Sequence, residues 1–444
     1  MIEFFTHPIL RGPTIGCMLM SFVSGLIGVF VFLRKQSLVG EALSHAAYPG
    51  VILGVVVAGA LFGSADDHPY IALGVMVGAF GTAILGFYLI NWVQARLHLS
   101  SDSALCLILS SFFGFGVLLA SHIQFTHTSL YKRALIYLYG QAATMTDMHI
   151  ILYGILAFAM SLVLFLFYKE LKVITLDSAY AKSMGIPVGK IDFVFFMLVV
   201  LSIVIGIRSV GVVLMSAMLI APAAAARQWS ERLWVILILS GAIGLFSGWL
   251  GNVLSVQIGD ALSNESSDIR TGVPTGPIIV LSAASICLLS LIFSPERGLL
   301  IRALRMLRFR LVCQRENILK SFWYFPEGKV QSYTQIKENL GVPALVLRWI
   351  LWTLSFYGYL VHQKGGYSLT KDGRAKAAHI VRLHRLWEAY LVTYLGFGAE
   401  RVHHSAEEME HIITPELEKE LTDLLNNPSK DPHNQPIPPH GAYL

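Results

Sequence analysis

Six histidine and glutamate residues near the C-terminus have the types and spacing of metal ligands. They are His384, Glu388, His403, Glu407, Glu410 and His411. The first two are four residues apart, and three of the others repeat that interval, so each set would share one face of a helix. Oxygen-rich sites without thiolate favour manganese or iron over zinc or copper. A single such pair would more simply be a solvated charged face; two in register favour a site for a divalent metal.

A similar pair lies near the N-terminus, inside an apolar stretch. Glu41 and His45 are four residues apart in the run 40–46, so they would share one helix face. Ionisable side chains within apolar segments are costly, which makes them candidates for function. A carboxylate beside an imidazole suits a passing transition metal. On spacing alone, a charged pair at the start of a helix is the simpler interpretation.

The segments that must position these residues differ in composition. The chain of 444 residues is 55% hydrophobic and only 14% charged, which is too apolar for a purely soluble protein. A helix of about 20 apolar residues crosses a bilayer. Runs that approach this length are 14–33, 70–93, 150–167, 193–207, 233–254 and 277–293. Less regular runs at 50–62, 104–120 and 211–226 are expected to be helical too, so we expect about eight to ten membrane helices.

Beyond residue 294 the composition becomes that of a soluble protein, after a basic stretch at 297–320. Lysine and arginine accumulate on the cytoplasmic side of membrane proteins. Other basic clusters are Arg34-Lys35, Lys169, Lys172, Lys182, Lys190, Arg227 and Arg232. The C-terminal part is therefore expected in the cytoplasm, joined by a linker at 294–313 that is a plausible cleavage or membrane-surface segment.

Two segments between or within the apolar runs carry further signals. Residues 176–187 read as a short amphipathic helix closed by Gly-Ile-Pro, which is either a docking site for a cytoplasmic partner or a solvated connector. Residues 211–226 are rich in small side chains and contain Pro222, which implies a bend and tight packing in a membrane helix. The chain contains no GxxxxGK[ST] phosphate loop, so any ATPase that drives transport is another chain.

These motifs, in this order, resemble the permease subunits of bacterial ABC importers for manganese, zinc and iron. The similar segments are 41–49 (EALSHAAYP), 176–187 (LDSAYAKSMGIP), 211–226 (GVVLMSAMLIAPAAAA) and 274–281 (PTGPIIVL). Glu41 stands where that family usually has aspartate. The resemblance covers about residues 5–293 and implies that Glu41 and His45 contact the transported metal.

The same resemblance implies a set of partners and a location. The partners would be a cytoplasmic ATPase, a periplasmic or lipid-anchored metal-binding protein, and a second permease subunit in a homo- or heterodimer. The location would be the bacterial inner membrane. The coupling residues toward the ATPase would be Leu176, Asp177, Ala181 and Gly185.

The soluble part begins with the pattern of a winged helix. Helices are expected at 316–325, 333–340 and 343–355, followed by two short strands at 359–361 and 367–369 around Gly365-Gly366. This layout binds DNA in many proteins and serves as a protein-interaction module in others. The candidate DNA contacts are Lys337, Arg348 and Thr353. The helix that would read bases is, however, very apolar, which favours metal binding by the tail over sequence-specific DNA reading.

Residues 314–440 also resemble the diphtheria-toxin-repressor family of metal-dependent regulators. The similar segments are 368–377, 382–388, 402–411 and 431–438. The resemblance implies that His384, Glu388 and His403 form one metal site and that Glu407, Glu410 and His411 belong to a second cluster. Iron-type members have cysteine at the position of Glu407, so this chain leans toward manganese. The ligand position in the first helix falls on Asn317, with Lys320 where manganese-type members have a carboxylate; both are poor ligands.

The sequence thus predicts a mainly α protein, and a transporter subunit rather than an enzyme. Its expected parts are a membrane permease (1–293), the basic linker, a winged helix-turn-helix (314–372) and a metal-binding and dimerisation domain (373–444). The cofactor is a divalent metal, with Mn²⁺ or Fe²⁺ favoured and Zn²⁺ also considered. Operator DNA is a further expected partner of the tail. The alternative is a tail that docks the ATPase, oligomerises or inhibits transport without binding DNA.

Overall fold

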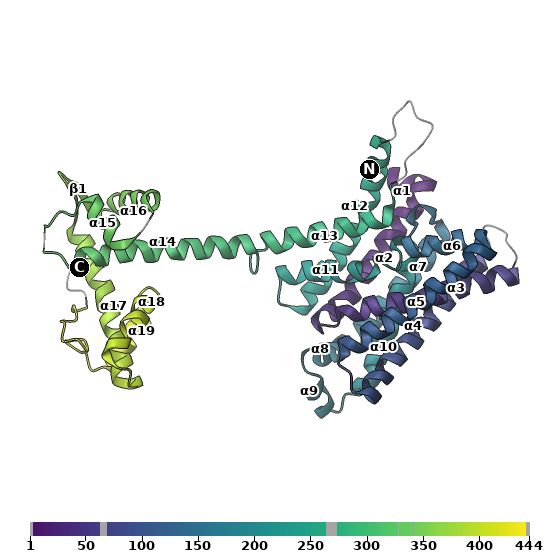
Figure 1. Cartoon of the computed structure of the whole chain (residues 1–444), viewed down its shortest axis with the longest axis horizontal. Coiled ribbons are helices and arrows are strands. Elements are labelled where there is room, and N and C mark those ends of the chain that lie inside the picture. The colour runs from purple at the N-terminus through teal and green to yellow at the C-terminus, as the bar shows by residue number, and fades with distance from the viewer. Residues whose placement is uncertain (1–2, 63–68, 263–272, 327, 342, 441–444) are drawn as a thin grey trace. The chain divides into compact units, whose positions relative to one another are not determined.

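The computed structural model describes residues 3–62, 69–262, 273–326, 328–341 and 343–440 (Figure 1). Contacts divide the chain into two units, Met1–Ile301 and Arg302–Leu444. The described parts are almost entirely helical, with one pair of strands, so the predicted mainly α class is confirmed. Each unit is described by itself.

In the part of the first unit that the structure describes, the regular elements are all helices. They are α1 (Glu3–Thr6), α2 (Pro8–Leu33), α3 (Ser37–Phe62), α4 (Pro69–Leu97), α5 (Ser101–Thr126), α6 (Thr128–Tyr139), η1 (Ala142–Thr144), α7 (Asp147–Leu166), α8 (Tyr168–Leu176), α9 (Ser178–Ser183), α10 (Val188–Val210), α11 (Met215–Trp229), α12 (Leu233–Leu262) and α13 (Thr275–Phe293). Within the described residues, eight of these are long and apolar enough to cross a membrane. This count lies within the predicted range.

The short helix α11 is not among these eight, but basic residues flank it and α10. Lys169, Lys172 and Lys182 precede α10 and Lys190 is in its first turn, while Arg227 is in the last turn of α11 and Arg232 lies just before α12. Both clusters would reach the same side of a membrane only if the chain returned between α10 and α12. With 15 residues, α11 is about 22 Å long.

Glycine permits the turn between α10 and α11 inside the protein. Gly211 ends α10 with a φ of +91°, and a Cβ there would lie 2.5 Å from the Leu138 carbonyl oxygen. Gly140, at the end of α6, is in the same situation: its φ is +76°, and a Cβ would lie 2.4 Å from the carbonyl carbon of Val210. The backbone amide of Val212 donates to the Tyr137 carbonyl (3.2 Å), so this non-helical backbone is hydrogen-bonded and buried, as membrane depth requires.

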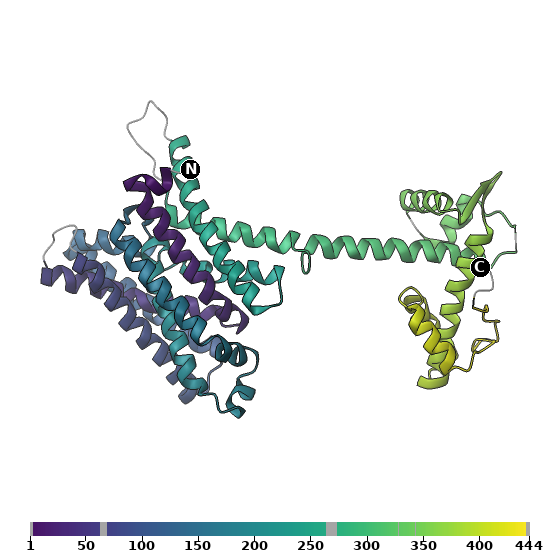
Figure 2. The same ribbon diagram turned by 180° about the vertical axis from the view of Figure 1, so that it is seen from behind.

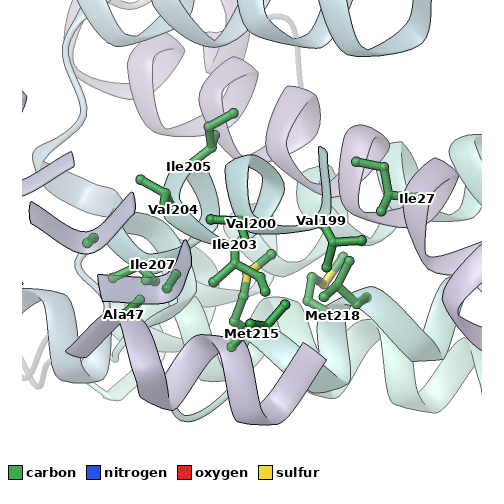
Figure 3. Packing of buried hydrophobic residues seen from close by; sticks show 14 of the residues in the cluster. Ile27, Ala47, Val199, Val200, Ile203, Val204, Ile205, Ile207, Met215 and Met218 are labelled. Atoms are coloured by element: carbon green, nitrogen blue, oxygen red, sulfur yellow. The ribbon is translucent and has the colours of Figure 1, made fainter. Parts of the chain in front are cut away.

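The core of the first unit surrounds α10. Figure 3 shows Val199, Val200 and Ile203 of α10 packed with Met215 and Met218 of α11. Helices α3, α4 and α5 pack against one another, and the view from behind shows them as a layer of long rods (Figure 2). The predicted run at 50–62 is therefore the second half of α3, which also carries Glu41 and His45 in its first turns.

The second unit contains a winged helix and a helical extension. Its elements are α14 (Leu299–Trp323), α15 (Tyr333–Leu340), α16 (Ala344–Phe356), β1 (Leu360–Gln363), β2 (Gly366–Leu369), α17 (Lys371–Leu395), η2 (Ala399–Arg401), α18 (His403–Met409) and α19 (Pro415–Leu424). The strands pair antiparallel, with Leu360 opposite Leu369. The predicted winged-helix order is confirmed; Val342, just before the predicted third helix, lies outside the described residues.

The predicted linker at 294–313 is mostly helix. Residues 299–313 form the first part of α14, which continues without a break into the helix predicted at 316–325. The reason is local: Pro295 and Gly298 lie before Leu299, and between 299 and 323 there is neither proline nor glycine. The basic residues do not prevent a helix here, because arginine is a good helix former.

Candidate metal centres

Three of the predicted ligands in the tail come together in a tight triangle. Nε2 of His384 lies 3.1 Å from Oε1 of Glu388 and 3.0 Å from Nδ1 of His403, and that nitrogen is 3.0 Å from the same Glu388 oxygen. Adjacent ligands of an octahedral ion at about 2.1 Å are about 3.0 Å apart. Among the residues that the structure describes, this is the group whose ligand atoms could hold one metal ion.

Burial and hydrogen bonding determine the charges within the triangle. His384 and Glu388 are 3% and 2% exposed. Burial alone would raise the pKa of Glu388, but hydrogen bonds from His384 and His403 outweigh it and lower that pKa to about 2. Burial would lower the pKa of His384, yet its hydrogen bonds to Glu388 and Glu410 raise it. The carboxylate is thus ionised, as metal binding requires.

The helix that carries His384 and Glu388 is fixed by its flanks. Thr370 caps the start of α17, where its hydroxyl oxygen accepts from the Gly373 amide (3.0 Å). Further along, Arg382 donates to Glu418 of α19 (2.8 Å) and to the Pro438 carbonyl (2.9 Å). Arg385 lies 3.4 Å from Asp431. Two of the quoted tail segments, 382–388 and 431–438, therefore meet in space.

The residues of the second predicted cluster are only partly brought together. Glu407 is half exposed and contacts His403 at 3.4 Å. Glu410 is fully buried and turns to Lys320 and His384 instead. His411 contacts α14, with Nδ1 2.7 Å from Glu316 Oε2. Glu410 Oε1 also lies 3.7 Å from His411 Nε2, so these two side chains remain neighbours, whereas the contact of Glu407 is to His403.

Two physical facts explain this separation. Helix α18 ends at Met409, so His411 does not continue the helical face of His403 and Glu407 as its spacing suggested. The chain must leave the helix here because Pro415 begins α19 and Thr414 before it is extended. The contact between His411 and Glu316 could not be predicted from the sequence, since no regular spacing connects the two residues.

The membrane pair lies in a different environment. Glu41 is half-buried and His45 is 9% exposed, one turn apart on α3. The His45 ring packs edge-on against Phe113 of α5, with centroids 4.7 Å apart. Its Nδ1 is buried and has no hydrogen-bond partner within the described residues. An imidazole nitrogen left free in this way is available to a ligand that passes through.

The predicted coupling residues occupy a short helix and its ends. Asp177 caps α9, where its carboxylate accepts from the amides of Ala179 (2.9 Å) and Tyr180 (3.0 Å). Leu176 is 79% exposed and Gly185 closes the segment with a φ of +79°. Ala181, in contrast, is fully buried, so it packs inside rather than facing a partner.

The exposed apolar face of this segment includes two residues that sequence reasoning missed. Tyr180 and Met184 are 57% and 58% exposed and follow Leu176 at intervals of four. The base of the segment is held by Arg34, which donates to Thr175 of α8 (3.2 Å) and Asp192 of α10 (2.7 Å). From the sequence, Arg34 is expected only to mark the cytoplasmic side of a membrane helix.

The winged helix presents an apolar face where bases would be read. Leu345, Trp349, Trp352 and Phe356 of α16 are 80%, 47%, 63% and 74% exposed. Among the candidate DNA contacts, Lys337 and Arg348 are exposed. Thr353 is a correction: it is 8% exposed, and its hydroxyl donates to the Trp349 carbonyl (2.7 Å). It belongs to the buried side of the helix.

Comparison with known proteins matches both halves of the chain. Residues 6–294 match the ABC 3 transport family, and residues 370–439 match the iron dependent repressor, metal binding and dimerisation domain. A probable metal transport system membrane protein of Chlamydia pneumoniae is 37% identical over 98% of both chains. The manganese transport system membrane protein MntC of Bacillus subtilis is 34% identical over 87% of this chain and 85% of its own.

A solved structure gives the same result for the membrane half. PsaBC from Streptococcus pneumoniae, in complex with Fab, is 28% identical and covers 69% of this chain and 97% of its own, with a TM-score of 0.57. The fold and the paired sites thus define a polytopic membrane permease joined to a repressor-like metal-binding domain. The chain belongs to the ABC 3 transport family.

Proposed function

We propose that this protein is the permease of an ATP-driven importer for a divalent transition metal, and that its tail senses the same metal in the cytoplasm. Manganese is the first candidate, because a relative named for manganese transport aligns with most of the chain, the tail included. The donor set of the tail, two imidazoles and a carboxylate without thiolate, agrees with manganese or iron. Family membership makes the chain a transport subunit rather than an enzyme.

The triangle of His384, Glu388 and His403 is the observation that carries the sensor. All three ligand atoms are about 3 Å apart, and two of the residues are almost fully buried. A buried carboxylate and imidazole are costly unless they are paired with each other or with a metal. A divalent ion would be held between α17 and α18, which links the start of α18 to the long helix.

Glu41 and His45 are our proposed metal contacts along the transport path. The free Nδ1 of His45 and the carboxylate one turn away are two donors on one face of α3. Two protein donors bind more weakly than three or four, which suits a site that must release its ion. Polar groups at such positions in a membrane protein commonly line a substrate pathway.

The proposed partners supply the parts of an importer that a permease lacks: ATP hydrolysis, a second pore subunit and delivery of the metal. Its sequence contains no phosphate loop, so the ATPase is a separate chain. We place its docking surface on Leu176, Tyr180 and Met184, the exposed apolar row of the α8–α9 segment. A second permease subunit, identical or not, would complete the pore, and an extracytoplasmic metal-binding protein would deliver the ion.

DNA is the proposed binding partner of the tail, as its winged helix suggests. Lys337 and Arg348 are exposed and suit phosphate contacts. The apolar face of α16 offers no base-edge donors, so we expect binding with little sequence discrimination and strong salt dependence. A mobility-shift titration against the promoter of its own operon and a scrambled duplex, with and without Mn²⁺, tests this; absence of any metal-dependent shift would remove DNA from the proposal.

Metal uptake by the assembled importer tests the function as a whole. In cells that lack other manganese importers, the chain expressed with its ATPase and binding protein should support accumulation of labelled Mn²⁺. The Glu41→Ala, His45→Ala double variant should not, although it reaches the membrane in equal amount. Uptake by the double variant at the wild-type rate would contradict the proposed path.

A further inference from the structure

One lysine is buried among the groups of the second cluster. Lys320, on α14, is 8% exposed, and its Nζ lies 2.6 Å from Glu410 Oε2 and 3.0 Å from His384 Nδ1. The Glu410 side chain is fully buried, and its oxygen Oε2 is also 2.5 Å from His384 Nδ1. An ammonium, a carboxylate and an imidazole from three elements thus meet at one point.

The charge of this group is already balanced. A buried carboxylate needs a cation or several hydrogen bonds, since an unpaired buried charge is strongly destabilising. The Lys320 ammonium supplies that cation to Glu410. A divalent ion at the same place would lie within hydrogen-bonding distance of a positive charge, and it would have to displace the lysine from its partner.

The other members of the predicted cluster have further partners. His411 is bound between Glu316 and Asn317 of α14, at 2.7 and 3.1 Å, and its Nε2 lies 3.7 Å from Glu410 Oε1. Glu407 points toward His403. The residues present therefore do not fit a second metal ion. They fit a salt-bridged contact that joins α14, α17 and the end of α18.

We propose that Lys320 is a built-in cation that takes the place of a second metal ion, so that the tail binds one divalent ion rather than two. This inference rests on the proposed sensor role and specifies it. The contact between α14 and the end of α18 is then present without metal. What the metal adds is the bond between α17 and His403 at the start of α18.

Lys320 and Glu410 also position the remaining metal site. Glu410 lies against Nδ1 of His384, the nitrogen opposite to the one that faces Glu388 and His403. A metal-binding histidine commonly has its second nitrogen held by a carboxylate, which sets the ring orientation. Lys320 is therefore a positioning residue that acts through Glu410.

The test is the number of Mn²⁺ ions per chain. The full-length protein in detergent is equilibrated with Mn²⁺, and bound metal is counted by mass spectrometry of the digested sample. The His384→Ala, Glu388→Ala variant should bind one ion fewer than wild type. Lys320→Glu, which replaces the cation with a ligand beside Glu410, should bind one ion more than wild type, and Lys320→Arg should bind the same number.

A further variant keeps the inference testable if Lys320→Glu does not fold. His411→Gln should leave the wild-type count unchanged, whereas loss of an ion would show that the second cluster holds metal and would overturn the inference alone. A folded Lys320→Glu protein without an added ion would do the same. Equal counts in wild type and the His384→Ala, Glu388→Ala variant would overturn the sensor proposal itself, and the single-ion tail with it.

Discussion

The two candidate metal sites use the same residue pair in opposite surroundings. Glu41 and His45 on α3, and His384 and Glu388 on α17, are both carboxylate and imidazole one turn apart. In the membrane unit, the histidine has an aromatic neighbour and a free nitrogen. In the tail, both nitrogens of His384 have partners, and a second histidine completes the site.

The difference reflects what each site must do. A transport site has to release its ion at every cycle, so few donors and a partly apolar wall are an advantage. A sensor has to hold its ion long enough to change the stability of a helix contact, and preorganised ligands reduce the cost of binding. Helical spacing alone therefore identifies a candidate pair. The residues around the pair decide whether it releases a metal ion or holds it.

The largest expected effect separates transport from sensing. Glu41→Ala should lower Mn²⁺ uptake by about 100-fold, because loss of a charged group from a buried site costs about 3 kcal/mol and each 1.4 kcal/mol is tenfold. Glu41→Asp is the matched control and should retain most of the uptake, since the charge stays. Metal bound by the tail should not change in either variant; a parallel loss there would break the comparison.

A substitution in the tail should have the opposite pattern of effects: it should weaken metal binding by the tail and leave transport unchanged. His384→Ala should lower Mn²⁺ affinity of that site by about 30- to 100-fold, since one of three ligands and the contact to Glu410 are lost. Calorimetric titration of the full-length protein measures it, with His404→Ala as control, because His404 is exposed and its ion-pair contact is to Glu408, outside the triangle. Mn²⁺ uptake should persist in this variant, because Glu41 and His45 are unchanged. Unchanged affinity would mean that the triangle does not hold the ion.

A moderate effect is expected at the surface between α8 and α10. Tyr180→Ala should lower uptake by about tenfold, because an exposed aromatic anchor of an interface contributes about 1–2 kcal/mol. Metal-stimulated ATP hydrolysis by the assembled importer should fall in parallel, while the metal content of the purified chain remains the same. Ser178→Ala, an exposed change on the same short helix, controls for local disturbance. If both variants transport normally, the ATPase docks elsewhere.

Prediction from the sequence worked best where a period or a motif was long. Membrane segments, the winged-helix order and the His384–Glu388 pair could be predicted because each depends on hydrophobic runs or on spacing within one helix. The basic linker predicted at 294–313 is helical from Leu299 onward, since charge density does not break a helix. The second cluster was inferred from a family resemblance, whereas the helical spacing predicted through 403–411 does not hold, because α18 ends at Met409.

What could not be predicted are contacts between helices. Lys320 is 64 residues from His384 and 90 from Glu410, and no local rule connects them. Arg34, 141 and 158 residues from its partners Thr175 and Asp192, is a similar case. Each is a single charged side chain that contacts two residues far away in the sequence. Such a contact leaves no pattern in the sequence.

The smallest expected effect is on stability, and it would sharpen the comparison further. Removing metal with EDTA should lower the unfolding temperature of the tail by about 5–10 °C relative to Mn²⁺ at 100 times its Kd, because such binding contributes about 2.7 kcal/mol at about 2–4 °C per kcal/mol. Hydrogen exchange should locate the change at α18, where His403 loses its link to α17, while α14 stays protected through Lys320 and Glu410. Protection of α3 should respond little, since a two-donor site holds its ion weakly. If EDTA exposes α14 as much as α18, the lysine contact depends on metal, and the tail is tied together by the ion rather than by its own charges.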